Sequence, residues 1–163
     1  MTGPEPAVGD ILLFAHATGM NRLITFFTRS RYYHVAIYAG DAHVVEARPQ
    51  GVTDRDLRGP LGTHFCAVLP APGGKGNEAL AWAREQLGAG YDRVDILVII
   101  LEHIFRRLHL NYAPPGKFSC GGFVALAFQH AGLELFPGRD PHGIDPADFA
   151  PLLPPAAEPR DVA

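Results

Sequence analysis

Short apolar runs separated by turn residues dominate the first part of the chain. Segment 10–14 (DILLF) follows a glycine and is rich in branched and aromatic residues, which predicts a buried strand. Segment 34–47 (HVAIYAGDAHVVEA) holds two β-prone runs around a central Gly-Asp pair and predicts a β-hairpin. Segment 65–69 (FCAVL), closed by a proline, predicts one more strand, and it places Cys66 in the sheet.

Helical periodicity of apolar positions appears in four segments. Helices are predicted over 21–29, 77–87, 92–109 and 119–131. Asn77 is a candidate N-cap of the second helix, and Gly88 is its expected stop. Ser119 is the candidate N-cap of the last helix.

Helices and strands occur in mixed, non-alternating order, which predicts the α+β class with a small antiparallel sheet packed against helices. With 163 residues, the chain is expected to form a single domain over residues 1–150. Residues 151–163 are rich in proline and are predicted to form a C-terminal tail.

Charge and hydropathy narrow the classes of partner. A formal net charge of -3 with scattered basic residues gives no basis for binding nucleic acid. The longest apolar run, 94–101, is shorter than the ~20 residues that a transmembrane helix needs, so no transmembrane segment is expected. The first ten residues lack the pattern of a secretory signal, which predicts a cytoplasmic location and reduced thiols on both cysteines.

The strongest chemical candidate is Cys120, next to the predicted N-cap Ser119. Unpaired backbone N–H groups and the positive end of the helix dipole stabilise a thiolate at a helix start, and a thiolate is the nucleophilic form of cysteine. The following Gly121 and Gly122 are poor helix formers. Without side chains, they are expected to let a substrate approach the sulfur. Position alone is equally compatible with Cys120 as a small buried residue.

Several segments, in this order, resemble the circularly permuted branch of NlpC-type papain-like cysteine hydrolases, which includes YiiX-like and lecithin retinol acyltransferase-like enzymes. The segments are GDILLF, FFTRS, HVAIYAGDAHVVEA, the pair Tyr91-Asp92, FSCGGFVALAF and IDPADF. The resemblance implies a permuted papain-like domain in which His34 is the base and Cys120 the nucleophile. It also implies an orienting polar residue at Glu46, twelve positions after His34. Many relatives have serine after the nucleophile, where this chain has Gly121.

The identity of the third residue depends on the hairpin loop. A three-residue loop over 39–41 sets Glu46 on the face of His34, whereas a two-residue turn at Gly40 and Asp41 sets His43 there instead. We favour Glu46, because the family spacing supports it and a carboxylate stabilises an imidazolium better. His43 remains the alternative.

No metal or organic cofactor is expected. His64 and Cys66, with His34 and Cys120, are types that bind zinc, but their spacing lacks a ligand pair such as Cys-x-x-Cys. Tyrosines 32, 33, 38 and 91 are candidates for lining a cleft, although packing in the hairpin is the commoner role of such residues. The apolar stretch 94–105 is either a core helix or a contact with an acyl chain or membrane surface.

Together these features predict a cysteine hydrolase of the amidase or peptidase type that forms a thioester on Cys120, with His34 as base and Glu46 holding it. A peptide, a peptidoglycan fragment or a lipid is the expected substrate. Two alternatives remain open. One is a lipid acyl hydrolase or acyltransferase of the same fold. The other is a non-catalytic module that binds a peptide or lipid.

Overall fold

The computed structural model describes residues 5–15, 30–59, 65–91 and 117–155. Its strands are β1 (Ile11–Phe14), β2 (His34–Gly40), β3 (His43–Arg48), β4 (Gly51–Asp56), β5 (Phe65–Leu69), β6 (Gly90–Tyr91) and β7 (Lys117–Phe118). Its α-helices are α2 (Gly76–Glu85) and α4 (Cys120–His130), and short 3-10 helices cover Pro72–Gly74, Pro141–Gly143 and Pro146–Leu152. The predicted helices over 21–29 and 92–109 lie outside the described residues.

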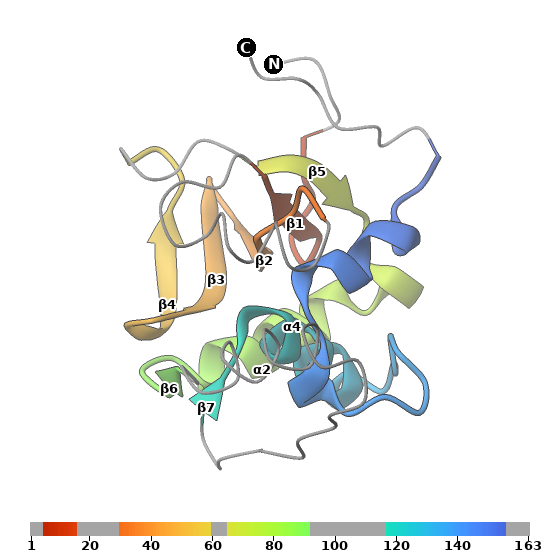
Figure 1. Cartoon of the computed structure of the whole chain (residues 1–163). Helices are drawn as coiled ribbons and strands as arrows, with labels where there is room; N and C mark the ends of the chain where they lie inside the picture. Colours follow the sequence, from red (N-terminus) through yellow and green to blue (C-terminus); the bar gives the residue numbers. More distant parts are fainter. Residues whose placement is uncertain (1–4, 16–29, 60–64, 92–116, 156–163) are drawn as a thin grey trace.

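Five strands form one antiparallel sheet in the order β4-β3-β2-β1-β5, while β6 and β7 form a short parallel pair. Helices α2 and α4 pack together on one side of the sheet (Figure 1). Alternate strand residues such as Leu13, Val35 and Val45 enter one buried core with Phe123 and Phe128 of α4. The predicted α+β class and the antiparallel sheet are therefore confirmed.

The hairpin of β2 and β3 has a register that neither predicted loop describes. Ile37 pairs with Val45, and a bulge then shifts the turn to Asp41 and Ala42. Both turn residues have positive φ, 46° and 57°, as in the type I′ turns that join twisted strands. Continued by one residue from the Ile37–Val45 pair, this register sets Glu46 across from Ala36, so Glu46 lies on the same sheet face as His34 and not directly opposite it.

Strand β4 was not predicted from the sequence. Its residues GVTDRD include few apolar side chains. The first two are buried, and the other four alternate between half-buried and exposed. Backbone pairing with β3 forms it, from Arg48 with Gly51 to His43 with Asp56. Charged side chains suit its place at the edge of the sheet. β4 carries Arg55, whose side chain reaches Glu46 on β3.

The ends of the two described α-helices test the predicted caps. Ser119 is the N-cap of α4, as predicted. The prediction that Asn77 caps α2 is wrong, because the helix begins at Gly76. The preceding 3-10 turn runs directly into α2, so that Lys75 already provides the first helical carbonyl, 3.0 Å from the N–H of Ala79. The helix ends at Glu85, before the expected stop at Gly88.

Two contacts fix the start of β1 against the segment that leads into α2. Asp10 is buried, and its carboxylate accepts the N–H groups of Ala7 and Ala71, each at 2.8 Å. Gly9 has a φ of 90°. A Cβ added to Gly76 would lie only 2.8 Å from the Cα of Gly9, so the two backbones approach closely. The Gly-Asp pair before β1 therefore has a structural role.

Candidate active site

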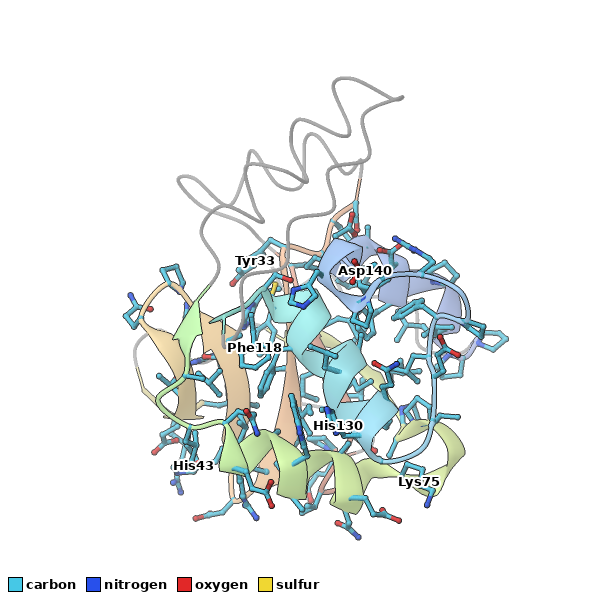
Figure 2. The ribbon with its side chains drawn as sticks, turned by 90° about the horizontal axis from the view of Figure 1, so that it is seen from below. Tyr33, His43, Lys75, Phe118, His130 and Asp140 are labelled. Carbon is cyan, nitrogen blue, oxygen red and sulfur yellow. The ribbon has the colours of Figure 1, made fainter. Side chains whose placement is uncertain are left out.

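Cys120 is the first residue of α4. The Oγ of Ser119 accepts the N–H of Gly122 at 3.2 Å, which satisfies one donor of the helix start. Cys120 is buried and its thiol is free of any disulfide. In Figure 2, Tyr33 and Phe118 lie toward this end of α4, and His130 lies toward the other. The helix start therefore places the thiol beside backbone N–H groups that have no partner within the helix itself.

The structure brings His34 and Glu46 together with Cys120. His34 opens β2, and its Nε2 lies 2.6 Å from Oε2 of Glu46. The Cys120 thiol lies close enough to the imidazole to contribute to its raised pKa. Because Nε2 faces Glu46, Nδ1 is the ring nitrogen that remains for the sulfur. The three side chains therefore follow one another in the order carboxylate, imidazole, thiol.

The pKa values of the two inner groups are displaced in opposite directions. Burial lowers the pKa of His34, but the Glu46 carboxylate and hydrogen bonds to Cys120 and Glu46 outweigh it and raise the pKa from 6.5 to about 9. Burial raises the pKa of Glu46, but His34 and the Arg55 guanidinium outweigh it and lower the pKa from 4.5 to about 2. An imidazolium beside a carboxylate is therefore the favoured state at neutral pH.

Two arginines complete the surroundings of Glu46, whose side chain is fully buried. Arg55 donates from Nε to Oε1 at 2.5 Å and from Nη2 to Oε2 at 3.1 Å, and Arg48 donates to Oε1 at 3.4 Å. Sequence reasoning missed both arginines. For Arg55 the sequence gives little signal, because GVTDRD contains few apolar residues and becomes a strand through pairing with β3.

His43, the alternative orienting residue, is not near His34. It lies on the opposite face of β3 from Glu46, because the two are an odd number of residues apart. Its Nδ1 lies 2.6 Å from Asp54 Oδ1 in a pair that is about one-third exposed. The hairpin bulge thus assigns the contact with His34 to Glu46.

Gly121 and Gly122 do not leave room for a substrate, contrary to our expectation. A Cβ on Gly121 would lie 2.3 Å from the carbonyl oxygen of Ile144, and one on Gly122 would lie 2.8 Å from that of Pro141. The segment 141–145 therefore packs directly against the start of α4. The glycines are explained by this close backbone approach, which also holds IDPADF beside Cys120.

We predict that Gly121→Ala lowers the free energy of unfolding by about 1–3 kcal/mol, because the added methyl group meets a backbone atom that cannot rotate away. Gly143→Ala is the matched control, since a Cβ there meets no atom within 4 Å. Chemical denaturation followed by the fluorescence of Trp82, the one tryptophan, measures both. Equal stability of the two variants would refute the close packing.

The tyrosines and the other residues considered for the site or for zinc lie in the positions described next. The Tyr33 ring stacks on His34 with centroids 6.3 Å apart, while the Tyr38 hydroxyl accepts the N–H of Ala42 within the hairpin turn. Tyr32 is buried in the core. Cys66 lies on β5 as predicted, but its side chain, that of Tyr91, all of His64 and the apolar stretch 94–105 lie outside the described residues. Within the described ranges, no cluster of three His, Cys, Asp or Glu residues is arranged to bind a metal.

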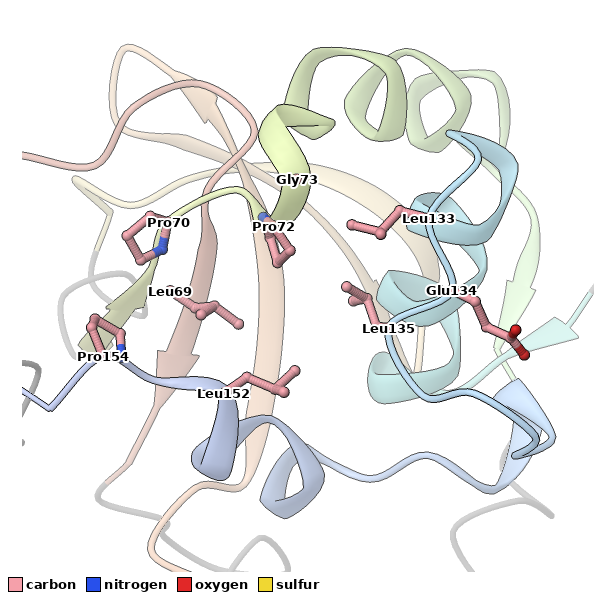
Figure 3. Close-up of a pocket in the computed structure, with 9 residues that line it drawn as sticks. All are labelled: Leu69, Pro70, Pro72, Gly73, Leu133, Glu134, Leu135, Leu152 and Pro154. Carbon is pink, nitrogen blue, oxygen red and sulfur yellow. The ribbon is translucent and has the colours of Figure 1, made fainter.

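A groove on another part of the surface has a volume of about 480 Å³ (Figure 3). Its walls are mostly apolar and come from the end of β5, the turn before α2, the loop after α4 and the end of the last 3-10 helix. None of its lining residues belongs to the group of Cys120, His34 and Glu46. The groove is therefore separate from the thiol site.

Comparison with known proteins identifies no family: no family model matches this sequence, and no curated protein is similar enough to match it. Of the helices that the structure describes, none has the length and apolar character needed to cross a membrane.

Proposed function

We propose that this protein is a cysteine hydrolase of the amidase or peptidase type, in which Cys120 is the nucleophile, His34 the acid and base, and Glu46 the residue that holds His34. The observation that carries this proposal is the His34–Glu46 pair beside a thiol at a helix start. The order of the residues, with the histidine before the cysteine, and the sheet packed on the nucleophile helix support a permuted papain-like domain.

The first half of the reaction is acylation. The Cys120 sulfur attacks the substrate carbonyl carbon, and the N–H at the helix start donates to the developing oxyanion. The tetrahedral intermediate collapses when the bond to the leaving nitrogen or oxygen breaks. His34 gives its Nδ1 proton to that leaving atom and becomes neutral. The product of this half is a thioester on Cys120.

The second half is deacylation. Neutral His34 accepts a proton from water, whose oxygen attacks the thioester carbonyl carbon as the bond to sulfur breaks. The acid leaves, and the thiolate and imidazolium are restored. Throughout both halves, Glu46 holds Nε2 and thereby keeps Nδ1 directed toward the sulfur. No metal or organic cofactor takes part in either step.

Intact-mass spectrometry tests this proposal and identifies the substrate class. A Cys66→Ser protein, in which Cys120 is the sole cysteine, is incubated with separate panels of activated esters, lipids and peptidoglycan peptides. We expect an acyl adduct that maps to Cys120, from the ester panel and from a peptide amide. Cys120→Ala is the control and should remain unmodified. Adducts from lipids alone would replace the amidase assignment with lipid acyl chemistry, and no adduct in any panel would reject catalysis.

A further inference from the structure

Glu46 has more cationic neighbours than a simple orienting residue needs. Its carboxylate faces His34 from β2, Arg48 from its own strand and Arg55 from β4. Cys120 of α4 adds the remaining ionisable group, on the far side of His34. The carboxylate is fully buried, so almost none of its charge is solvated by water.

Arg55 makes the strongest of these contacts. Its Nε and Nη2 donate to the two different oxygens of Glu46. This bidentate hydrogen bonding fixes both the position and the plane of the carboxylate. Arg48 reaches one oxygen only, at 3.4 Å. The Arg55 guanidinium also lies over the Phe14 ring, 5.6 Å from its centroid, and that ring lies 5.5 Å from the imidazole of His34.

The proposed reaction creates a need for this cation. While His34 is protonated, it balances the charge of Glu46. After His34 has given its proton to the leaving group, Glu46 would be a buried carboxylate beside a neutral ring. Without another cation nearby, this buried charge is energetically unfavourable. Glu46 would then tend to take up a proton from water, and the neutral carboxyl group would hold the Nε2–H less firmly, so that Nδ1 would be less well directed toward the sulfur.

We propose that Arg55 is a positioning residue of the site. By donating hydrogen bonds to both oxygens of Glu46, it keeps this carboxylate ionised and aligned while His34 changes its protonation state. This role rests on the proposed function. Arg55 acts through Glu46 and not on the substrate, since its side chain is only 16% exposed and two of its nitrogens bond the carboxylate.

The test follows hydrolysis of the acetyl group from Cys120 after reaction with para-nitrophenyl acetate, in the Cys66→Ser background and across the pH range. We expect Arg55→Met to lower the maximal rate about tenfold through misalignment of the imidazole. It should also move the rising limb of the pH profile upward by about one pH unit, because His34 then faces a less compensated carboxylate. Arg55→Lys should leave that limb near its wild-type position, since it retains the charge.

Two controls separate this role from general damage. Arg58→Met makes the same change at an exposed arginine just after β4, where the partners are Asp41 and Asp56, and should leave the profile unchanged. Glu46→Gln removes the charge that Arg55 serves. In that background, Arg55→Met should change the maximal rate by less than about twofold. The double variant also leaves no buried carboxylate unpaired, so it serves if Arg55→Met alone does not fold.

The outcomes distinguish the two proposals. A wild-type protein that forms no acetyl adduct on Cys120, or never releases it, overturns the proposed function together with this role. A wild-type protein that turns over, with an Arg55→Met profile that overlays it, overturns the role of Arg55 alone. The same holds if Arg55→Met is as harmful with Gln at position 46 as with Glu.

Discussion

Replacing His34 by alanine should slow the alkylation of Cys120 by iodoacetamide about 30-fold at about pH 6. A free cysteine, with a pKa of ~8.5, is almost entirely protonated at that pH and reacts slowly. In the proposed mechanism, the positively charged His34 imidazolium is the partner of the Cys120 sulfur and activates it as a nucleophile. The rate is measured by mass spectrometry in the Cys66→Ser background, so that one thiol is followed.

The matched control for this prediction is His43→Ala. His43 is a histidine of the same hairpin, but it pairs with Asp54 on the opposite face of β3. Its removal should leave the alkylation rate unchanged. Equal rates for the wild-type protein and His34→Ala would show that the imidazole does not activate Cys120.

Replacing Glu46 by alanine should lower the free energy of unfolding by about 3–5 kcal/mol, the range for a buried ion pair that loses one partner. The variant leaves Arg55 and the protonated His34 facing a space without their shared acceptor. Glu46→Gln should cost less, because the amide oxygen still accepts a hydrogen bond. Denaturation followed by Trp82 fluorescence measures the loss.

The pH dependence of this loss has a definite sign. The pKa of Glu46 is lowered from 4.5 to about 2, so its stabilising effect is present above pH 4.5 and disappears as the pH falls toward 2. The pKa of His34 is raised from 6.5 to about 9, so its effect is complete below pH 6.5 and disappears as the pH rises through 9. The cost of Glu46→Ala should therefore be largest between these limits, from about pH 4.5 to 6.5.

Asp54→Ala is the control for stability. Asp54 also pairs with a histidine across two strands, but its side chain is 37% exposed. Exposed ion pairs contribute about 0–1 kcal/mol, so this variant should be almost as stable as the wild type. Equal losses for Asp54→Ala and Glu46→Ala would contradict the buried network around Glu46.

The positions of Cys120 and His34 could be predicted from the sequence. Ser119 before an apolar helical stripe predicts a helix start, and this places Cys120 at the first position of α4. The β-prone run after Tyr33 places His34 at the beginning of a strand. Both inferences use local patterns, namely an N-cap and a strand boundary. Each pattern depends on only a few neighbouring residues.

The placement of Glu46, Arg55 and the glycines after Cys120 depends on contacts between segments that local sequence patterns do not determine. The hairpin turn lies at Asp41 and Ala42, and alanine with positive φ is not a residue that local preferences place there. The accompanying bulge is what puts Glu46 on the face of His34. Arg55 was missed because β4 has few apolar residues and forms through pairing with β3. The glycines after Cys120 were misinterpreted because their neighbour, Ile144, is distant in sequence.

The most direct test of the account is the ultraviolet absorbance of the Cys120 thiolate, taken as the difference between the Cys66→Ser protein and its Cys120→Ala derivative. We predict a thiolate signal already at about pH 6, which disappears when His34 is replaced by alanine. A signal that appears only near pH ~8.5 and is the same with and without His34 would contradict the pairing of thiolate and imidazolium on which the proposed function depends.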